Sequence, residues 1–263
     1  MATAARPLAI ITGASSGIGL ELARCCVHGG YDAIICADGP EIHDVALGLR
    51  ASGAIVEAVQ ADLATAEGVD ELYAAIGGRQ VAALLANAGR GLGHAFLDQS
   101  WSDIQRVIDT NVTGTLYLIH RVAKDMRSAG RGRILITGSI AGFMPGTYQA
   151  VYNGTKALLD SFSFALRAEL KDTGVTVTCL MPGATETDFF ETAEMLDTKV
   201  GASKKQPADE VAKIGFEAMQ AGDGDVVAGW GNKLRQAISN VLPSGMLADQ
   251  HAKLAKPGSA AKA

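Results

Sequence analysis

The sequence predicts an α/β domain in which a parallel sheet is covered by helices on both faces. Three observations favour this fold class. Short runs rich in β-branched residues recur along the chain, longer segments with helical spacing separate them, and the runs are apolar throughout rather than alternating. Strands that alternate with helices build βαβ units, and strands covered on both sides have no polar face. At 263 residues with 48% apolar content, the chain is long enough for one such domain.

Seven segments are predicted to be strands: L-A-I-I-T (8–12), D-A-I-I-C-A (32–37), A-I-V-E-A-V (54–59), V-A-A-L-L-A (81–86), R-I-L-I-T (133–137), V-T-V-T-C-L (175–180) and D-V-V-A-G (225–229). A helix is predicted over 151–172, because Leu158, Phe162, Ala165, Leu166 and Leu170 fall near one stripe. We find no internal repeat or linker. We therefore expect one domain over 1–250 and a frayed tail at 251–263, where the residues are mostly small and polar.

The charge and composition of the chain exclude several classes of function. The net charge is −5 and 19% of residues are charged, so there is no basic face for nucleic acid. No apolar run approaches the roughly 18–20 residues that span a bilayer, and the N-terminus does not resemble a secretory signal. The four cysteines have no C-x-x-C spacing, so we expect reduced thiols, no metal site and a cytoplasmic protein.

A glycine-rich turn, T-G-A-S-S-G-I-G (12–19), directly follows the first predicted strand. Its glycines let the backbone approach a ligand, and the start of the next helix leaves N–H groups that suit a pyrophosphate. The alternative is a tight turn that simply needs glycine. The place of the turn after strand one favours a dinucleotide, with Gly13, Ser15, Ser16, Gly17, Ile18 and Gly19 as the binding residues.

Asp38 ends the second predicted strand and is expected to select the cofactor. A carboxylate there accepts both ribose hydroxyls of NAD, but it would lie beside the 2′-phosphate of NADP. One unit-charge repulsion at ~4 Å costs roughly 1–4 kcal/mol, which is about tenfold to a thousandfold in affinity. No Arg or Lys occurs at 39–40 or in the glycine turn. NAD is therefore the predicted cofactor and NADP is disfavoured, unless Asp38 instead caps the following turn.

Two further strand ends carry candidate binding residues. Asp62 and Leu63 follow strand three, and Asn87, Ala88 and Gly89 follow strand four. In an open α/β sheet a ligand binds at the carboxyl ends of the strands. Ordinary loop chemistry is the alternative for both groups.

Tyr152 and Lys156 lie four residues apart, on the same side of the predicted helix, and Ser139 closes the apolar run before it. Free tyrosine has a pKa near 10 and is a poor base at neutral pH. An ammonium ~4 Å away favours the phenolate by roughly 4 kcal/mol, or about three pKa units. The pair is thus a candidate for proton transfer, and a solvated helix face is the alternative.

Taken together, the glycine turn, Asn87-Ala88-Gly89, Asn111 in N-V-T-G, Ser139, Tyr152-x-x-x-Lys156 and Pro182-Gly183 resemble the short-chain dehydrogenase/reductase family. The motifs occur in order from about residue 6 to about residue 230. The resemblance implies a Rossmann-type, doubly wound sheet of seven strands in the order 3-2-1-4-5-6-7, usually in dimers or tetramers. Close relatives carry Arg at the position of Asp38 and use NADP, so this departure supports NAD.

The resemblance also implies roles for individual residues. Tyr152 would exchange the substrate proton, Ser139 would hold the substrate oxygen, and Lys156 would also bind the nicotinamide ribose. Asn111 would position a water that links Lys156 to solvent, although it could instead stabilise an irregular helix. In the cofactor-binding segment that begins at Pro182 and Gly183, the Thr185 backbone and the Thr187 hydroxyl would meet the nicotinamide carboxamide.

The candidate substrate pocket is mostly apolar and has no Arg or Lys clamp. Its predicted walls are His94, Phe96, Phe143, Met144, Tyr148, Phe189, Phe190, Met195 and Leu196, with a substrate loop at about 187–206. This composition favours a neutral, largely apolar secondary alcohol or ketone. Core or subunit contacts are the alternative for several of these side chains, and His94 is expected to be a loop residue.

The sequence therefore predicts an oxidoreductase that transfers hydride between NAD and such an alcohol or ketone. The alternative is a catalytically silent protein that senses a dinucleotide, and the intact Asn-Ser-Tyr-Lys set favours the enzyme. The apolar stripe after Tyr152 and the region 226–230 predict a homo-oligomer, and the family resemblance implies a tetramer ahead of a dimer.

Overall fold

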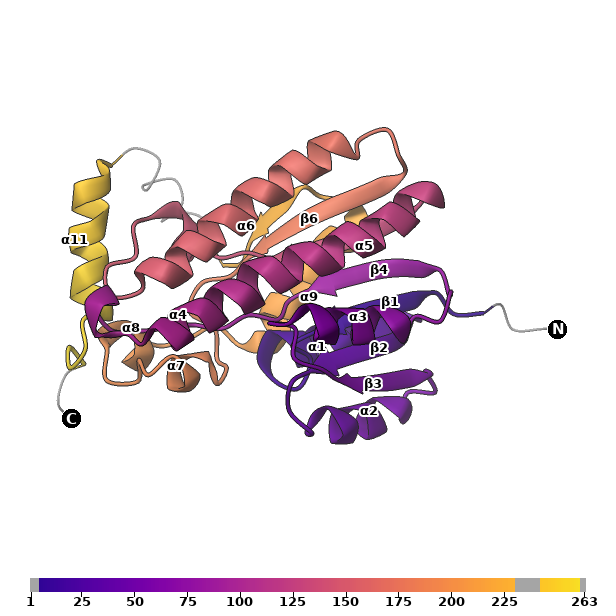
Figure 1. Ribbon diagram of the computed structural model, residues 1–263, viewed down its shortest axis with the longest axis horizontal. Coiled ribbons are helices and arrows are strands. Elements are labelled where there is room, and N and C mark those ends of the chain that lie inside the picture. The colour runs from indigo at the N-terminus through magenta and orange to yellow at the C-terminus, as the bar shows by residue number, and fades with distance from the viewer. Residues whose placement is uncertain (1–4, 230–241, 261–263) are drawn as a thin grey trace.

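A parallel sheet of seven strands runs through the centre of the computed structural model, which describes residues 5–229 and 242–260 (Figure 1). The strand order is β3-β2-β1-β4-β5-β6-β7, so the order implied by the family resemblance is confirmed. The strands are β1 (Leu8–Thr12), β2 (Asp32–Ala37), β3 (Val56–Gln60), β4 (Val81–Ala86), β5 (Gly132–Thr137), β6 (Val175–Met181) and β7 (Asp225–Val227).

The third and seventh strands differ most from their predicted ranges, 54–59 and 225–229. The Ile55 side chain is exposed and its N–H donates to Asp32 Oδ1 at 2.8 Å, so β3 begins at Val56. Gly229 has a φ of 91°, a left-handed conformation that strands do not continue through, and β7 ends before it.

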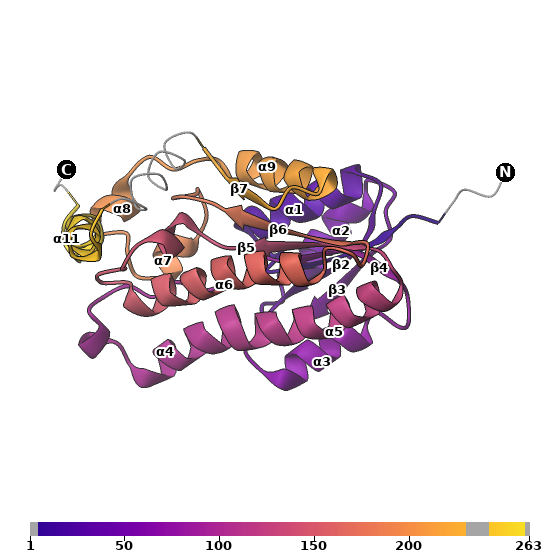
Figure 2. The same cartoon turned by 90° about the horizontal axis from the view of Figure 1, so that it is seen from above.

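Helices cover both faces of the sheet, as Figure 2 shows. One face carries α1 (Gly17–His28), α2 (Ile42–Arg50) and α9 (Ala208–Ala221), and the other carries α3 (Ala66–Ala74), α4 (Trp101–Ile108), α5 (Thr115–Ser128) and α6 (Ala150–Glu169). Two separate apolar cores result, one on each side of the strands. The uniformly apolar strands are explained by this burial on both faces.

The α6 helix only partly follows the predicted stripe. Phe162 and Leu166 pack against the core and Leu170 is buried, but Leu158 is exposed. The helix ends at Glu169 rather than at 172, and residues 170–174 turn the chain into β6.

Further elements lie beyond the carboxyl edge of the sheet, where the site is found. They are η1 (Phe96–Asp98), η2 (Asp109–Gly114), η3 (Ile140–Phe143), α7 (Phe189–Thr192), α8 (Lys199–Ala202) and α11 (Ser244–Ala255). The prediction of a frayed tail from 251 is wrong for the described part. His251 and Ala255 are buried in α11, and the Ala260 N–H donates to the Asp197 carbonyl at 2.8 Å.

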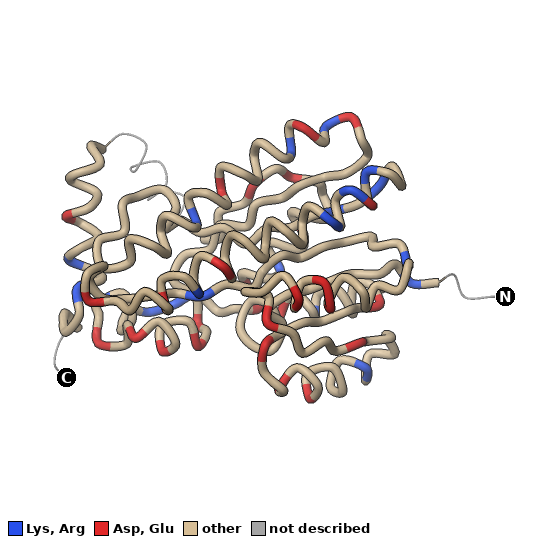
Figure 3. The backbone as a smooth tube through the Cα atoms, viewed as in Figure 1, with Lys and Arg blue, Asp and Glu red and all other residues tan. Residues whose placement is uncertain are grey.

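The surface charges are mixed along the chain. Figure 3 shows Lys and Arg scattered among Asp and Glu on the described elements. None of the described helices is both long and apolar enough to cross a bilayer. All four cysteines are free, and Cys26, Cys36 and Cys179 are buried. Within 5–229 and 242–260, no cluster of His, Cys, Asp and Glu has the make-up of a metal site.

Candidate active site

A cavity of about 520 Å³ opens at the carboxyl ends of the strands. It brings together every residue that the sequence assigned to a cofactor: Gly13, Ser15, Ser16, Gly17, Ile18, Gly19, Asp38, Asp62, Leu63, Asn87, Ala88, Gly89, Tyr152, Lys156, Pro182, Gly183, Thr185 and Thr187. Ser139 lines the same cavity. Segments distant in sequence meet here because all parallel strands end at one edge of the sheet.

The glycine turn forms a close-packed cradle at the start of α1. A Cβ atom built on Gly19 would lie 1.9 Å from the Gly13 carbonyl oxygen, so a larger residue does not fit there. Ser16 precedes the helix and its side chain makes no capping hydrogen bond. The first N–H groups of α1 therefore have no side-chain cap, and the cradle fits a dinucleotide pyrophosphate.

A chain of hydrogen bonds joins the ends of three strands. The Asn87 amide donates to the Thr12 carbonyl at 3.1 Å, and the Thr137 hydroxyl donates to Asn87 Oδ1 at 3.1 Å. Lys156 Nζ donates to the Thr137 carbonyl at 2.8 Å. The lysine is therefore held at a fixed place relative to the glycine turn.

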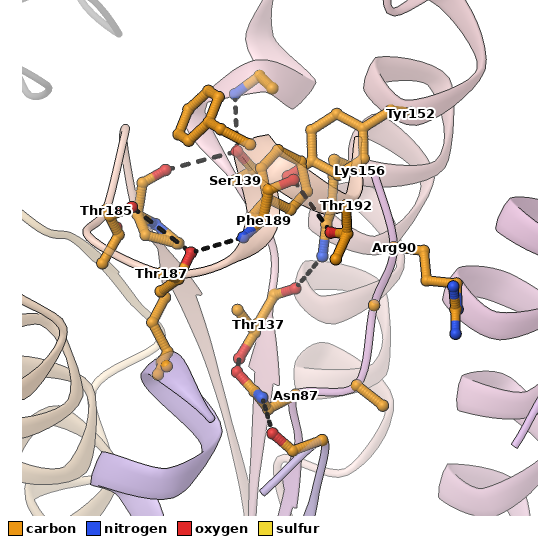
Figure 4. Close-up of a pocket in the computed structure, with 18 of the residues that line it drawn as sticks. Asn87, Arg90, Thr137, Ser139, Tyr152, Lys156, Thr185, Thr187, Phe189 and Thr192 are labelled. Carbon is orange, nitrogen blue, oxygen red and sulfur yellow. Dashed lines mark hydrogen bonds between the residues drawn. The ribbon is translucent and has the colours of Figure 1, made fainter. Parts of the chain in front are cut away.

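Ser139, Tyr152 and Lys156 converge on the same part of the cavity, as Figure 4 shows. Ser139 precedes η3, and its hydroxyl accepts from the Ala141 N–H at 3.1 Å and donates to the Pro182 carbonyl at 3.4 Å. Tyr152 lies in the first turn of α6, with its ring centroid 5.0 Å from that of Phe189. Lys156 Nζ lies 5.9 Å from the tyrosine ring centroid.

The proton affinities differ from the sequence expectation. Burial raises the pKa of Tyr152 to about 12, against the hydrogen bond with Ser139, which lowers it. The lysine was expected to bring the phenol close to neutrality. That expectation is wrong, because burial raises the pKa of Tyr152 and also lowers the pKa of Lys156 to about 8.

Asn111 is buried in η2, a π-helical segment between α4 and α5. Its Oδ1 accepts from the Arg90 N–H at 2.7 Å, and its Nδ2 donates to the Arg90 carbonyl at 2.9 Å and to Thr155 Oγ1 at 3.0 Å. It does not line the cavity. These contacts fit the alternative in which Asn111 stabilises an irregular helix, and they also fix the loop after Gly89.

The environment of Asp38 contains two arginines that its sequence neighbours do not reveal. Arg90 Nη2 lies 2.7 Å from Asp38 Oδ2, and Arg106 Nη2 lies 3.6 Å from it. Arg106 Nη1 also lies 2.9 Å from Asp62 Oδ2. Burial acts to raise the pKa of Asp62, but the Ala64 N–H and the Arg106 guanidinium outweigh it and lower that pKa. The absence of Arg and Lys at 39–40 and in the glycine turn therefore did not reveal the two cations that lie beside Asp38.

The segment after β6 bends around the cavity through short contacts. The Thr185 hydroxyl donates to the Gly183 carbonyl at 3.0 Å, and the Phe189 N–H donates to the Thr187 hydroxyl at 3.3 Å. The backbone of Thr185 also pairs with Gln206. These contacts direct α7 over the cavity.

Only part of the predicted substrate pocket lines the cavity. Met144, Phe189 and Phe190 do so, whereas the remaining predicted residues do not line it: His94, Phe96, Phe143, Tyr148, Met195 and Leu196. Phe143 packs against Ile140, Cys179, Met181 and Val227, and Tyr148 packs against Phe190, Ala193, Met195 and Ala255.

His94 and Phe96 lie on the loop after β4. Phe96 is exposed, and His94 Nε2 lies 3.1 Å from Glu194 Oε2, which joins this loop to the segment after β6. The expectation that His94 is a loop residue fits this position. Leu196 is also exposed.

Sequence reasoning missed the wall of the cavity that α11 supplies. Leu247, Gln250, His251 and Leu254 line it, together with Gln149, Thr192 and Val200 from other segments. The i, i+3, i+4, i+7 spacing of the α11 residues is a helical signal that could have been found. Nothing in the sequence shows which cavity that face would cover.

The His251 ring joins α11 to the start of α6. Its Nδ1 lies 2.9 Å from the Thr147 carbonyl and therefore carries the hydrogen, and its Nε2 lies 3.5 Å from the Asn153 amide nitrogen. Burial lowers the pKa of His251 from its usual value of 6.5, against the Thr147 hydrogen bond. A second proton on Nε2 would face the donor Asn153.

We expect His251 to make the folded protein less stable in mild acid. Because its folded pKa lies below 6.5, the unfolded chain binds more protons in the window just below that pH, and stability falls as pH decreases through it. The midpoint temperature of thermal unfolding, measured from neutral to mildly acid pH, should fall more steeply for the wild type than for His251→Gln. His43→Gln, on the exposed side of α2, is the control and should keep the wild-type slope. Parallel slopes in wild type and His251→Gln would contradict this account.

Comparison with known proteins gives consistent matches. The family model described as short chain dehydrogenase matches residues 7–196. An uncharacterised short-chain type dehydrogenase/reductase of Sinorhizobium fredii is 36% identical over 206 residues, which are 78% of this chain and 79% of that protein.

Two solved structures have similar folds. A short-chain dehydrogenase from Sphingobium yanoikuyae in complex with NADPH has a TM-score of 0.80 at 28% identity, covering 90% of this chain and 96% of that chain. The bulky-bulky ketone specific alcohol dehydrogenase from Comamonas testosteroni has a TM-score of 0.76 at 25% identity, covering 90% of this chain and 95% of that chain. The range matched by the family model includes the glycine turn, Ser139, Tyr152 and Lys156.

Proposed function

The chain belongs to the short-chain dehydrogenase/reductase family, and we propose that it transfers hydride between NAD and a neutral, mostly apolar secondary alcohol or the corresponding ketone. It is an oxidoreductase that acts on CH–OH groups with a nicotinamide cofactor. The observation that carries the proposal is the meeting of Ser139, Tyr152 and Lys156 in the cavity that the glycine turn opens into.

The chain's own residues have distinct tasks in this proposal. The bound nicotinamide would supply the hydride acceptor or donor. Tyr152 takes the alcohol proton during oxidation and returns it during reduction. Ser139 holds the substrate oxygen by a hydrogen bond, and its own contacts to Ala141 and Pro182 fix its direction. Lys156 holds the nicotinamide ribose and, as an ammonium, lowers the pKa of Tyr152.

The pyrophosphate would be held by the glycine turn, and the adenosine ribose by Asp38. The preference for NAD rests on that carboxylate, which can accept two ribose hydroxyls and repels a 2′-phosphate. Arg90 and Arg106 oppose the preference, because they partly neutralise Asp38. We therefore expect NAD to bind at least about tenfold more tightly than NADP, which is the lower end of the range expected for one unit-charge repulsion.

The composition of the cavity wall supports the proposed substrate class. Met144, Phe189, Phe190, Leu247 and Leu254 are apolar, and no Lys or Arg lies among the lining residues contributed by α7 and α11. A neutral, largely apolar substrate suits such a wall. The ketone-specific relative from Comamonas testosteroni supports a ketone as the oxidised partner.

A panel of secondary alcohols and ketones, assayed through nicotinamide absorbance with NAD and with NADP, tests the proposal. We expect turnover of apolar members with NAD and little turnover of carboxylated or phosphorylated analogues. The opposite ranking would contradict the substrate class. Binding of cofactor with no turnover of any member would favour the silent dinucleotide sensor, for which Tyr152 has no use.

We also propose that the protein is a homo-oligomer, a tetramer ahead of a dimer. Leu158 and Phe164 on α6 are each 42% exposed, and Trp101 on α4 is 68% exposed. Apolar side chains left exposed on neighbouring helices support an interface between copies. Trp230, at the end of the other region that predicted an interface, lies outside the described residues.

Sedimentation should show a species several times heavier than the 27.2 kDa chain. Leu158→Glu combined with Phe164→Glu should shift this species toward the monomer, because two buried charges at an interface are costly. Leu47→Glu, on the exposed face of α2, is the matched control and should leave the sedimenting species unchanged. A wild type that sediments as a monomer at micromolar concentration would disprove the proposal.

A further inference from the structure

A buried carboxylate lies behind Ser139 and has no part in the mechanism described so far. Asp160 is on α6, one helical turn after Lys156 and two turns after Tyr152. It is 4% exposed and does not line the cavity, so it does not touch substrate. Burying a carboxylate without a cation partner is costly, and its position needs a physical explanation.

The contacts of Asp160 are to the serine segment and to β6. Its Oδ1 accepts from the Ser139 backbone N–H at 3.2 Å and from Cys179 Sγ at 3.5 Å. Its Oδ2 is buried and has no hydrogen-bond partner among the described residues.

Two glycines that flank Ser139 leave the space that Asp160 fills. A Cβ atom built on Gly138 would lie 1.9 Å from Asp160 Oδ1, and one built on Gly142 would lie 2.2 Å from Asp160 Oδ2. Any other residue at either position would displace the carboxylate. The backbone on both sides of Ser139 is therefore shaped around Asp160.

The charge of Asp160 acts on the two proton-carrying groups of the site. The titratable groups near it are Lys156, Tyr152 and Cys179. Burial raises the pKa of the Cys179 thiol to about 12, so it stays neutral. Lys156 forms no ion pair with Asp160 at the distances of a salt bridge, but the carboxylate raises the lysine pKa against the burial that lowers it.

The opposed effects of burial and of the Asp160 charge on the Lys156 pKa matter for the reaction. Lys156 assists Tyr152 only while it is an ammonium, and burial alone would make it lose its proton at lower pH. The negative charge of Asp160, one helical turn away, offsets that loss without reaching into the substrate cavity, and the same charge raises the pKa of Tyr152.

We propose that Asp160 is a positioning residue that anchors Ser139 through its backbone N–H and keeps Lys156 protonated. The inference rests on the proposed function, since it concerns the acid–base pair of that reaction. A purely structural anchor would need only a hydrogen-bond acceptor, whereas the proposed role also needs the negative charge. The two roles can be separated by replacing Asp160 with Asn.

The test is the NMR titration of Lys156 in protein with ¹³C-labelled lysine, the signal being identified by its loss in Lys156→Arg. Asp160→Asn keeps an oxygen for the Ser139 N–H but removes the charge. We expect the Lys156 pKa to fall by about one unit or more in this variant. Cys179→Ala removes the other donor to Oδ1 and leaves the carboxylate charge, so the lysine pKa should fall much less than in Asp160→Asn. An unchanged Lys156 pKa in Asp160→Asn would overturn the proposal.

The wild type offers a second measurement if Asp160→Asn does not fold. Burial raises the pKa of Asp160 to about 6. The Lys156 signal should then show a second inflection near pH 6, where the carboxylate gains its proton. A Lys156 titration curve with a single step would contradict the proposed effect of the Asp160 charge on the lysine.

Activity gives an independent readout. In ketone reduction, the loss of rate at alkaline pH should begin about one pH unit lower in Asp160→Asn, with KM unchanged. If the wild type turns over no alcohol or ketone, the proposed function fails while the NMR result still decides the role of Asp160.

Discussion

Tyr152→Phe should reduce turnover by about 10²–10⁴-fold, the usual contribution of a positioned acid–base group. The phenylalanine ring retains the contact with Phe189, whose centroid lies 5.0 Å from that of Tyr152, so the cavity should keep its shape. Only the hydroxyl that we propose as the carrier of the substrate proton is lost. Steady-state kinetics with the best substrate of the panel measures the loss in kcat.

Cofactor binding provides the internal control for this variant. The glycine turn and Asp38 are untouched, so calorimetric titration with NAD should give nearly the wild-type affinity. Tyr148→Phe is a matched control, because Tyr148 lies just before α6 but does not line the cavity, and it should keep normal turnover. Full activity in Tyr152→Phe would end the assignment of Tyr152 as the proton carrier.

The second large effect is expected at Asp38, where opposite shifts should follow from two single substitutions. Asp38→Ala removes the ribose acceptor and the repulsion, so it should weaken NAD and strengthen NADP. Arg90→Ala frees the carboxylate from its partner at 2.7 Å and should move the preference further toward NAD. Each shift is expected to be roughly tenfold, the scale of one partly screened charge contact. Calorimetry with both cofactors measures it.

Larger changes and salt provide further checks of the same interaction. Asp38→Arg with Gly39→Arg should invert the preference, because a guanidinium matches phosphate geometry. The discrimination of the wild type should narrow at high ionic strength, since salt screens exposed charges. Equal affinities, or tighter NADP, in the wild type would mean that Asp38 caps its turn or that Arg90 and Arg106 decide the cofactor.

The fold and the residues that meet in the cavity were accessible from the sequence because they depend on local patterns. Apolar β-branched runs and helical stripes report burial on two faces, which sets the layers of the domain. The glycine turn and the Tyr152-x-x-x-Lys156 spacing are short-range geometry, so their place at one sheet edge follows from the topology. The family resemblance supplied the strand order, which the periodicity alone does not give.

Contacts between distant segments could not be read in this way. Arg90 and Asp38 are 52 residues apart and meet at 2.7 Å, so the charge around Asp38 depends on the packing of strand ends. Gly138, Gly142 and Asp160 fit together across 18 to 22 positions, and neither a glycine nor a carboxylate predicts that fit by itself. The cavity wall supplied by α11 is a similar case.

The sequence by itself determined that the chain has a doubly wound sheet, a dinucleotide turn and a Ser-Tyr-Lys set. Only the tertiary structure decided the strength of each charge there. Electrostatic energies depend on burial and on partners brought from elsewhere in the chain, and burial raises the pKa of Tyr152 to about 12 where the neighbouring Lys156 predicted a decrease. Local spacing fixes which groups can meet, whereas desolvation, which the complete fold sets, fixes how they ionise.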